Sequence, residues 1–240
     1  LPNVETAICA EPDGLAYTLA NLERLVVKPV GESGGYGITI GPRASKAELE
    51  ECRARLLAEV EQMASTIDPA DLAVQWDVST EMAQWEGVRH AYFDNVQQGV
   101  VDRVALHCQA VPRGVELGIH LCYGDYGHRH WKEPDSTANM VAVTNKVSGK
   151  VGRPIDWVHM PVPRSRHDEP YFAPLSDLRL RPETRLYLGL IHLSDGIEGA
   201  RRRMAAAGHY AAGFGLATEC GFGRRPPGTI GDLLALHAAL

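Results

Sequence analysis

The chain has 240 residues, 45% of them hydrophobic, which is enough for the core of one large domain or two small ones. Its formal net charge of -6, without a basic block, argues against nucleic acid or a membrane surface as a partner. The sequence has no apolar run of about 18 residues. Leu1–Glu5 lacks the charged-then-apolar order of a signal peptide, so we expect a cytoplasmic protein.

The five cysteines are widely scattered and odd in number. This pattern argues against a disulfide framework and favours reduced thiols.

The first predicted unit is a β-hairpin. Two β-branched runs, Leu25–Val30 and Tyr36–Ile40, flank the glycine-rich stretch Gly31–Gly35. Such a tip can place backbone N–H groups against phosphates, with Lys28 as a point charge. A flexible turn is the simpler explanation of the glycine spacing alone.

The identities of the residues in this segment are more specific than the spacing of its glycines. Over about residues 1–57 the chain resembles the circularly permuted ATP-grasp family, in the stretches Leu1–Val4, Leu25–Gly37 and Ile40–Pro42. The resemblance implies that nucleotide phosphates would be covered by Lys28, Ser33, Gly34 and Gly35. An ATP-grasp site also needs acidic and amide Mg²⁺ ligands, and no other stretch matches them. ATP with Mg²⁺ is therefore not the expected cofactor, and an ATP-binding ligase fragment is the alternative function.

A long helix follows the hairpin. Ser45 and Glu48 form a capping box, and apolar residues recur at three-to-four residue spacing as far as Met63. The helix is expected to end near Ser65. We place the boundary between two units within it, with residues 1–58 before and residues 59–240 after.

Beyond residue 59 the pattern alternates between buried strands and helices. The predicted strands cover Leu72–Val78, 116–123, Asp156–Val162, Leu186–Leu193 and Ala212–Thr218, and a closing helix starts at Thr229. Continuous apolar strands alternating with helices predict an α/β fold with a parallel sheet covered on both faces.

Five of these strands end in a side chain that could do chemistry, namely Asp77, Cys122, His159, His192 and Cys220. For any one of them a structural role is equally plausible, but active sites of α/β barrels gather at the carboxyl ends of the strands. His120 and Cys122 share one face of their strand. If that strand and the one before Cys220 are neighbours, the three side chains form a zinc set with an open position.

The same residues carry a second resemblance, over about residues 59–240. The motifs Gln75–Asp77, His120–Tyr123 and Glu219–Arg224 resemble the catalytic barrel of cobalamin-independent methionine synthase and its uroporphyrinogen-decarboxylase-like relatives. The resemblance implies a partial (β/α)8 TIM-barrel-like fold in which His120, Cys122 and Cys220 bind catalytic zinc. It also implies that Asp77 would hold the amino group of an amino-acid thiol.

Two positions depart from that pattern. Where the family has a glutamate ligand this chain has His159, which could be a fourth zinc ligand or replace a substrate contact. His192 only loosely matches the family's aspartate-histidine segment and is the candidate proton donor.

Arg224 follows the last strand and is a candidate binder of substrate carboxylate or phosphate, as are Arg164 and Arg225. Arg201–Arg203 are expected on an exposed helical face.

These inferences predict a zinc-dependent transfer of a methyl group to a homocysteine-like thiol. The partners would be a small-molecule thiol and a methyl donor. An eight-stranded barrel takes about 250 residues, whereas residues 59–240 supply five strands. The open edges could be covered by the N-terminal hairpin and helix or by a second copy in a homo-oligomer. A truncated barrel without activity is the remaining alternative.

Overall fold

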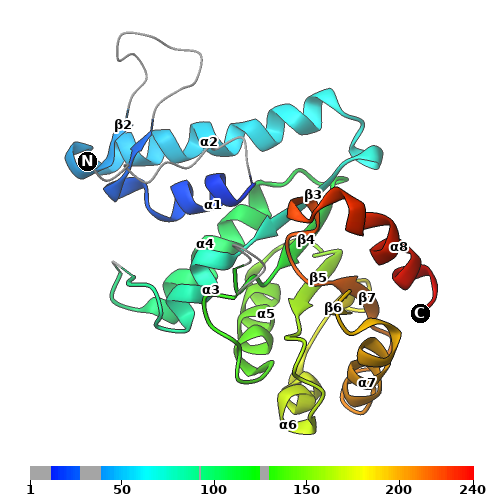
Figure 1. The fold of residues 1–240 in the computed structure, drawn as a ribbon. Coiled ribbons are helices and arrows are strands. Elements are labelled where there is room, and N and C mark those ends of the chain that lie inside the picture. Colours follow the sequence, from blue (N-terminus) through cyan, green and yellow to red (C-terminus); the bar gives the residue numbers. More distant parts are fainter. Residues whose placement is uncertain (1–11, 28–38, 92, 125–129) are drawn as a thin grey trace, which may run out of the picture.

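The computed structural model describes residues 12–27, 39–91, 93–124 and 130–240, which form an α/β fold (Figure 1). Its centre is a parallel sheet of five strands in the order β3-β4-β5-β6-β7. A separate antiparallel pair, β1-β2, belongs to the N-terminal part. The predicted α/β fold class is confirmed.

The five parallel strands lie where the apolar runs predicted them. Their bounds are β3 Ala73–Asp77, β4 Glu116–His120, β5 Trp157–Pro161, β6 Arg185–Ile191 and β7 Gly215–Thr218. Each strand pairs with the next one in the sequence. This is the order of consecutive strands in a (β/α)8 barrel.

Helices follow each strand of the sheet and lie outside it (Figure 1). They are α3 Ser79–Trp85, α4 Val96–Ala110, α5 Ala138–Lys150, α6 Glu169–Phe172, α7 Gly196–Gly208 and α8 Ile230–Ala238. Short 3-10 turns are η1 Leu22–Arg24, η2 Gly41–Arg43, η3 Pro69–Asp71, η4 Ala173–Asp177, η5 Phe222–Arg224 and η6 Pro227–Thr229.

Alternation along the strands places the apolar core residues and the polar residues on opposite faces of the sheet. On β4, Leu117 and Ile119 are buried in the main hydrophobic cluster. Glu116, Gly118 and His120 alternate with them, so period-2 geometry directs them to the other, inner face. The inner face is therefore the one that carries polar groups.

The N-terminal part packs into the same core. It comprises α1 Pro12–Ala20, β1 Val26–Val27, β2 Thr39–Ile40 and α2 Lys46–Thr66. The capping box is confirmed, since Ser45 Oγ accepts a hydrogen bond from Glu48 N at 3.3 Å and Glu48 Oε2 accepts one from Ser45 N at 2.7 Å. The helix α2 runs unbroken through residue 58.

The helix α1 was not predicted from the sequence. It contacts β3 and α3, and its Leu19 is fully buried in one cluster with Trp76 and Met82. The segment before the predicted boundary thus covers the β3 side of the sheet.

Two predictions about the first 58 residues meet the structure only in part. Val26 pairs with Ile40 in an antiparallel register, as the hairpin requires. The nucleotide-binding candidates Lys28, Ser33, Gly34 and Gly35 lie outside the described residues.

Within the described ranges, every helix is too short or too polar to cross a membrane.

Candidate metal centre

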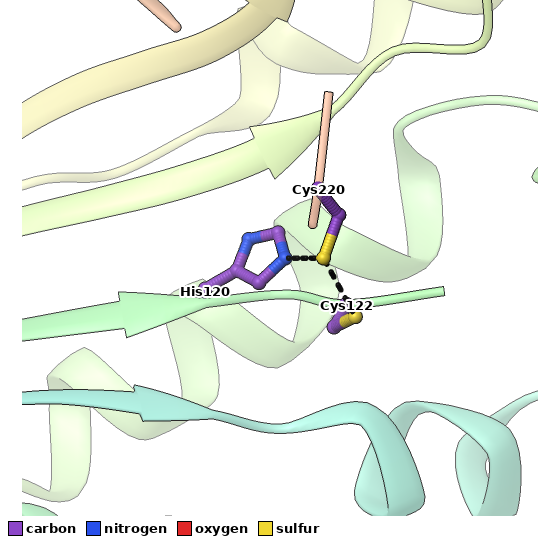
Figure 2. Close-up of side chains that lie close together, drawn as sticks. All are labelled: His120, Cys122 and Cys220. Carbon is purple, nitrogen blue, oxygen red and sulfur yellow. Dashed lines mark hydrogen bonds between the residues drawn. The ribbon is translucent and has the colours of Figure 1, made fainter. Parts of the chain in front are cut away.

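Three side chains from two distant segments of the chain meet at one point (Figure 2). His120 Nε2 lies 3.2 Å from Cys220 Sγ, and Cys122 Sγ lies 3.5 Å from the same sulfur. All three donor atoms are within 4.8 Å of one another. His120 and Cys122 are buried, and Cys220 is half-buried. Both cysteines are free thiols.

The route by which the chain brings them together differs from the one expected. The strands β4 and β7 are not neighbours, because β5 and β6 lie between them. In a flat sheet three strand spacings would separate them by about 14 Å. The sheet therefore curls as a barrel wall does, and the segment after β7 returns across the inner face to reach β4.

The surroundings of Cys122 lower the pKa of its thiol. Its hydrogen bond with Cys220 is the largest influence on its pKa, and burial opposes it. The His120 imidazole and the backbone N–H of Gly124, 3.3 Å from the sulfur, add to the effect. Together they lower the pKa of Cys122 to about 4. A metal-binding cysteine must be deprotonated, and the lowered pKa favours that form.

The pKa of His120 is shifted in the opposite direction to that of Cys122. Burial disfavours its charge, but the hydrogen bond with Cys122, the Cys122 charge and the Asp77 carboxylate outweigh burial and raise its pKa to about 9. The two shifts favour an imidazolium beside a thiolate, and a metal cation that replaces the imidazolium proton would keep that charge balance.

The donor set also has the dimensions of a zinc site. Tetrahedral zinc with one nitrogen and two sulfur ligands separates the ligand atoms by about 3.6–3.8 Å. The two measured separations, 3.2 Å and 3.5 Å, need only small side-chain shifts to reach those values. One imidazole and two thiolates are ligands that zinc prefers.

His159 is placed differently from the three donors. It lies in the middle of β5, paired in register with His120 of β4. Its ring stacks on that of His120, with centroids 4.5 Å apart, and neither of its nitrogens belongs to the three-residue group. Burial and the charge of His120 hold the pKa of His159 well below its usual value. It is therefore a neutral ring packed behind a candidate ligand.

Asp77 ends β3 beside His120, its register partner on β4. Its Oδ1 accepts a hydrogen bond from Gln75 Nε2 at 3.1 Å, and its side chain is half-buried. Arg224 lies in η5 and is exposed. Its neighbour Arg225 forms an ion pair with Glu219.

His192 follows β6 and is held by two hydrogen bonds. Its Nε2 lies 2.8 Å from the carbonyl oxygen of Val162, which can only accept, so this nitrogen carries a hydrogen. Its Nδ1 lies 2.9 Å from Glu219 Oε2, so the two groups form a hydrogen bond whenever either of them is protonated there. Burial and the charge of Arg203 lower the pKa of His192 to about 4, which favours the neutral ring at neutral pH.

These groups open onto a cavity of about 340 Å³ at the carboxyl ends of the strands. Cys220, Glu219 and His192 line it, together with Arg164. The Arg164 Nη1 donates a hydrogen bond to Ser194 Oγ at 3.0 Å. Of the three donors, Cys220 is the one that lines this cavity, so a small molecule would approach the group from its side.

Sequence reasoning missed the carboxylate that fixes the segment after Cys122. Glu86 accepts hydrogen bonds from Tyr123 Oη at 2.6 Å, Lys132 Nζ at 2.6 Å and Asn139 Nδ2 at 2.7 Å. Although burial opposes ionisation, these bonds lower its pKa. The ring of Trp131 stacks on Tyr123. Glu86 belongs to no motif, so only the three-dimensional structure identifies it.

The prediction that Arg203 lies on an exposed helical face is wrong. Arg201 and Arg202 are exposed, but Arg203 is 1% exposed. Its guanidinium forms a bidentate pair with Asp195, at 2.7 Å and 2.9 Å, and donates to the carbonyl oxygens of Leu190 and Arg164. It fixes the loops around the cavity because helical periodicity turns this one arginine inward.

Comparison with known proteins finds the first resemblance in the N-terminal part. Residues 1–65 match the family model described as "A circularly permuted ATPgrasp". Over 62 residues the chain is 45% identical to "Putative glutamate--cysteine ligase 2-2" of Frankia casuarinae, covering 26% of this chain and 7% of that protein. Over 49 residues it is 53% identical to an uncharacterised protein of Mycobacterium tuberculosis, covering 20% and 9%. The chain thus spans less than a tenth of the length of these relatives.

The chain is also similar to a solved structure. That structure is the "Putative Vitamin-B12 Independent Methionine Synthase" of Listeria monocytogenes, with a TM-score of 0.49 and 17% identity, covering 80% of this chain and 56% of that one. The family-model match confirms the resemblance stated from the sequence for the N-terminal part.

Proposed function

We propose that the chain binds one zinc ion through His120, Cys122 and Cys220 and uses it to transfer a methyl group to a thiol. The observation that carries the proposal is the meeting of these three donors at the carboxyl ends of parallel strands. Three protein ligands leave a fourth position for substrate, which is the pattern of catalytic zinc. The site motifs of the sequence support the same reaction class.

Zinc would supply acidity, since a thiol that coordinates it loses its proton at neutral pH and becomes a nucleophile. The residues of the chain would hold the metal and position the substrate. Cys122 lies against His120, and its lowered pKa favours the thiolate that zinc binds. Asp77, beside His120, would hold the ammonium group of an amino-acid thiol. Arg224 would reach the substrate only from the rim, since it is exposed.

His192 would serve as the proton donor to the leaving group. The carbonyl of Val162 and the Glu219 carboxylate hold the ring through its two nitrogens. Because burial and Arg203 lower its pKa to about 4, the ring would first take up a proton, such as the one that the substrate thiol loses, and then pass it to the leaving nitrogen. Glu219 precedes Cys220 directly, so one segment carries both a zinc ligand and the partner of the acid.

The test uses Co²⁺ in place of zinc, because thiolate ligands give Co²⁺ a sulfur-to-metal absorption band. Adding homocysteine to the cobalt-loaded protein should strengthen this band, and adding homoserine should not. Equal spectra with both compounds would contradict thiol binding at the metal. S-methylated product should then appear only in the presence of a methyl donor, with methylated pterins tested first.

The alternative function is nucleotide binding by the N-terminal part, favoured by the family-model match over residues 1–65. It predicts that ATP with Mg²⁺ raises the melting temperature and that Lys28→Ala abolishes the increase. An unchanged melting temperature with saturating nucleotide would eliminate it.

A further inference from the structure

A second cavity, of about 410 Å³, lies on the inner face of the sheet. Its lining includes Glu116, Trp157 and Arg185, the first residues of β4, β5 and β6. The cavity therefore occupies the amino-terminal half of the strands, whereas the candidate metal centre lies at their carboxyl ends. His159 lines the cavity and stacks on His120, and so lies between the two sites.

Two aromatic rings have fixed positions in this lining. A Cβ atom on Gly118 would lie 1.9 Å from Cε2 of Trp157, and one on Gly215 would lie 2.4 Å from Cε1 of Tyr187. Each ring thus occupies the space in which a neighbouring strand would otherwise carry a side chain. Trp157 Nε1 also donates a hydrogen bond to Gln75 Oε1 at 2.9 Å. Both rings remain half-buried, so part of their surface faces the cavity.

The charge of the lining is negative. Glu116, Asp156 and Glu183 contribute three carboxylates, and Arg185 contributes one guanidinium. The Oδ2 of Asp156 accepts a hydrogen bond from Leu117 N at 2.7 Å and lies 3.9 Å from Nη2 of Arg153, which partly neutralises it. In the part of the chain that the structure describes, the side chains of Glu116 and Glu183 have no hydrogen bond or ion pair. Their charges are therefore available to a ligand.

We propose that this cavity binds a small organic cation that carries an alkylated ammonium group. The faces of aromatic rings attract such cations, and they also cover the apolar alkyl groups. The surplus carboxylates add attraction that a neutral ligand would not gain. The cavity has the size of a small-molecule site. The proposal does not depend on a metal at His120.

The probe is choline, compared with its neutral carbon analogue, in which a tert-butyl group replaces the trimethylammonium group. Both are titrated into the full chain by isothermal calorimetry. Choline should bind at least about 10-fold more tightly than the analogue, because only the cation interacts with the ring faces and carboxylates. Equal affinities, or no heat from choline, would overturn the proposal.

Two variants locate the binding. Glu183→Gln removes an exposed carboxylate of the lining and should weaken choline binding about 3-fold. Glu198→Gln, on the exposed face of α7, is the matched control and should leave the affinity unchanged. Equal effects of the two variants would place the cation elsewhere and overturn the proposal.

Sedimentation of the same samples tests whether a second copy of the chain occupies this face instead. A monomer at all concentrations used supports the small-ligand proposal. Self-association that Glu183→Gln abolishes, without a change in choline binding, would overturn it.

Discussion

Burial of Glu81 in the helix α3 predicts how the stability of the protein depends on pH. In the sequence, α3 follows β3 and directly precedes Glu86. The side chain of Glu81 is fully buried, and neither carboxylate oxygen has a hydrogen-bond partner among the described residues. Burial raises the pKa of Glu81 from 4.5 to about 7, against the lowering effect of Arg103 and Arg89. The folded protein therefore favours the protonated carboxyl group.

The sign and size of the effect follow by linkage. Glu81 binds its proton more tightly in the folded state, so its contribution to stability is fully present below about pH 4.5 and is lost as the pH rises through 7. The difference between the two pKa values corresponds to about 3 kcal/mol. Glu81→Gln cannot ionise, and at about pH 8 it should be more stable than the natural chain by up to about 3 kcal/mol.

The assay is urea unfolding of both proteins at about pH 5 and about pH 8. The stability gained by the variant should be small at the lower pH and large at the higher one. The control, Glu198→Gln on the surface of α7, should change stability by less than about 0.5 kcal/mol at either pH. A gain from Glu81→Gln that is the same at both pH values would refute the reasoning.

Three further substitutions test the supports of the candidate sites. Arg203→Met should lower the free energy of unfolding by about 3 kcal/mol, because it leaves Asp195 without its bidentate partner. Glu86→Gln should weaken zinc binding about 10-fold in competition with a chelator, because it loosens the segment after Cys122. Gly118→Ala should cost about 1–3 kcal/mol and alter tryptophan fluorescence, because its Cβ would collide with the Trp157 ring.

Each of these expectations has a clear contrary result. A stability of Arg203→Met equal to that of Arg201→Met, on the same helix but exposed, would show that the buried guanidinium contributes nothing. Natural zinc affinity in Glu86→Gln would remove Glu86 from the account of the metal centre. Unchanged fluorescence and stability in Gly118→Ala would mean that the ring moves aside freely.

The positions of the strands could be predicted because each is rich in apolar residues, as Leu186–Ile191 illustrates. The pairing of His120 with Cys122 could be predicted from two-residue spacing alone. The path of Cys220 to β4 could not, because it depends on the curvature of the sheet.

Side-chain partnerships were equally hidden from the sequence. Arg203 stands in a run of three arginines, and the choice of the buried one depends on the phase of α7. The contact of Glu219 with His192 depends on where two loops end. The short helix α1 begins with Pro12 and contains Gly14, which weakens the helical signal.

The most direct test of the central claim is the zinc content of the purified chain by elemental analysis, with the variants Cys220→Ala and Cys108→Ala. Cys108 is a buried thiol on α4 outside the three-residue group, so its variant controls for the loss of a cysteine. We predict close to one zinc per chain in the natural protein and in Cys108→Ala, and none in Cys220→Ala. A natural chain that stays free of zinc after reconstitution, or a Cys220→Ala variant that keeps its zinc, would contradict the account.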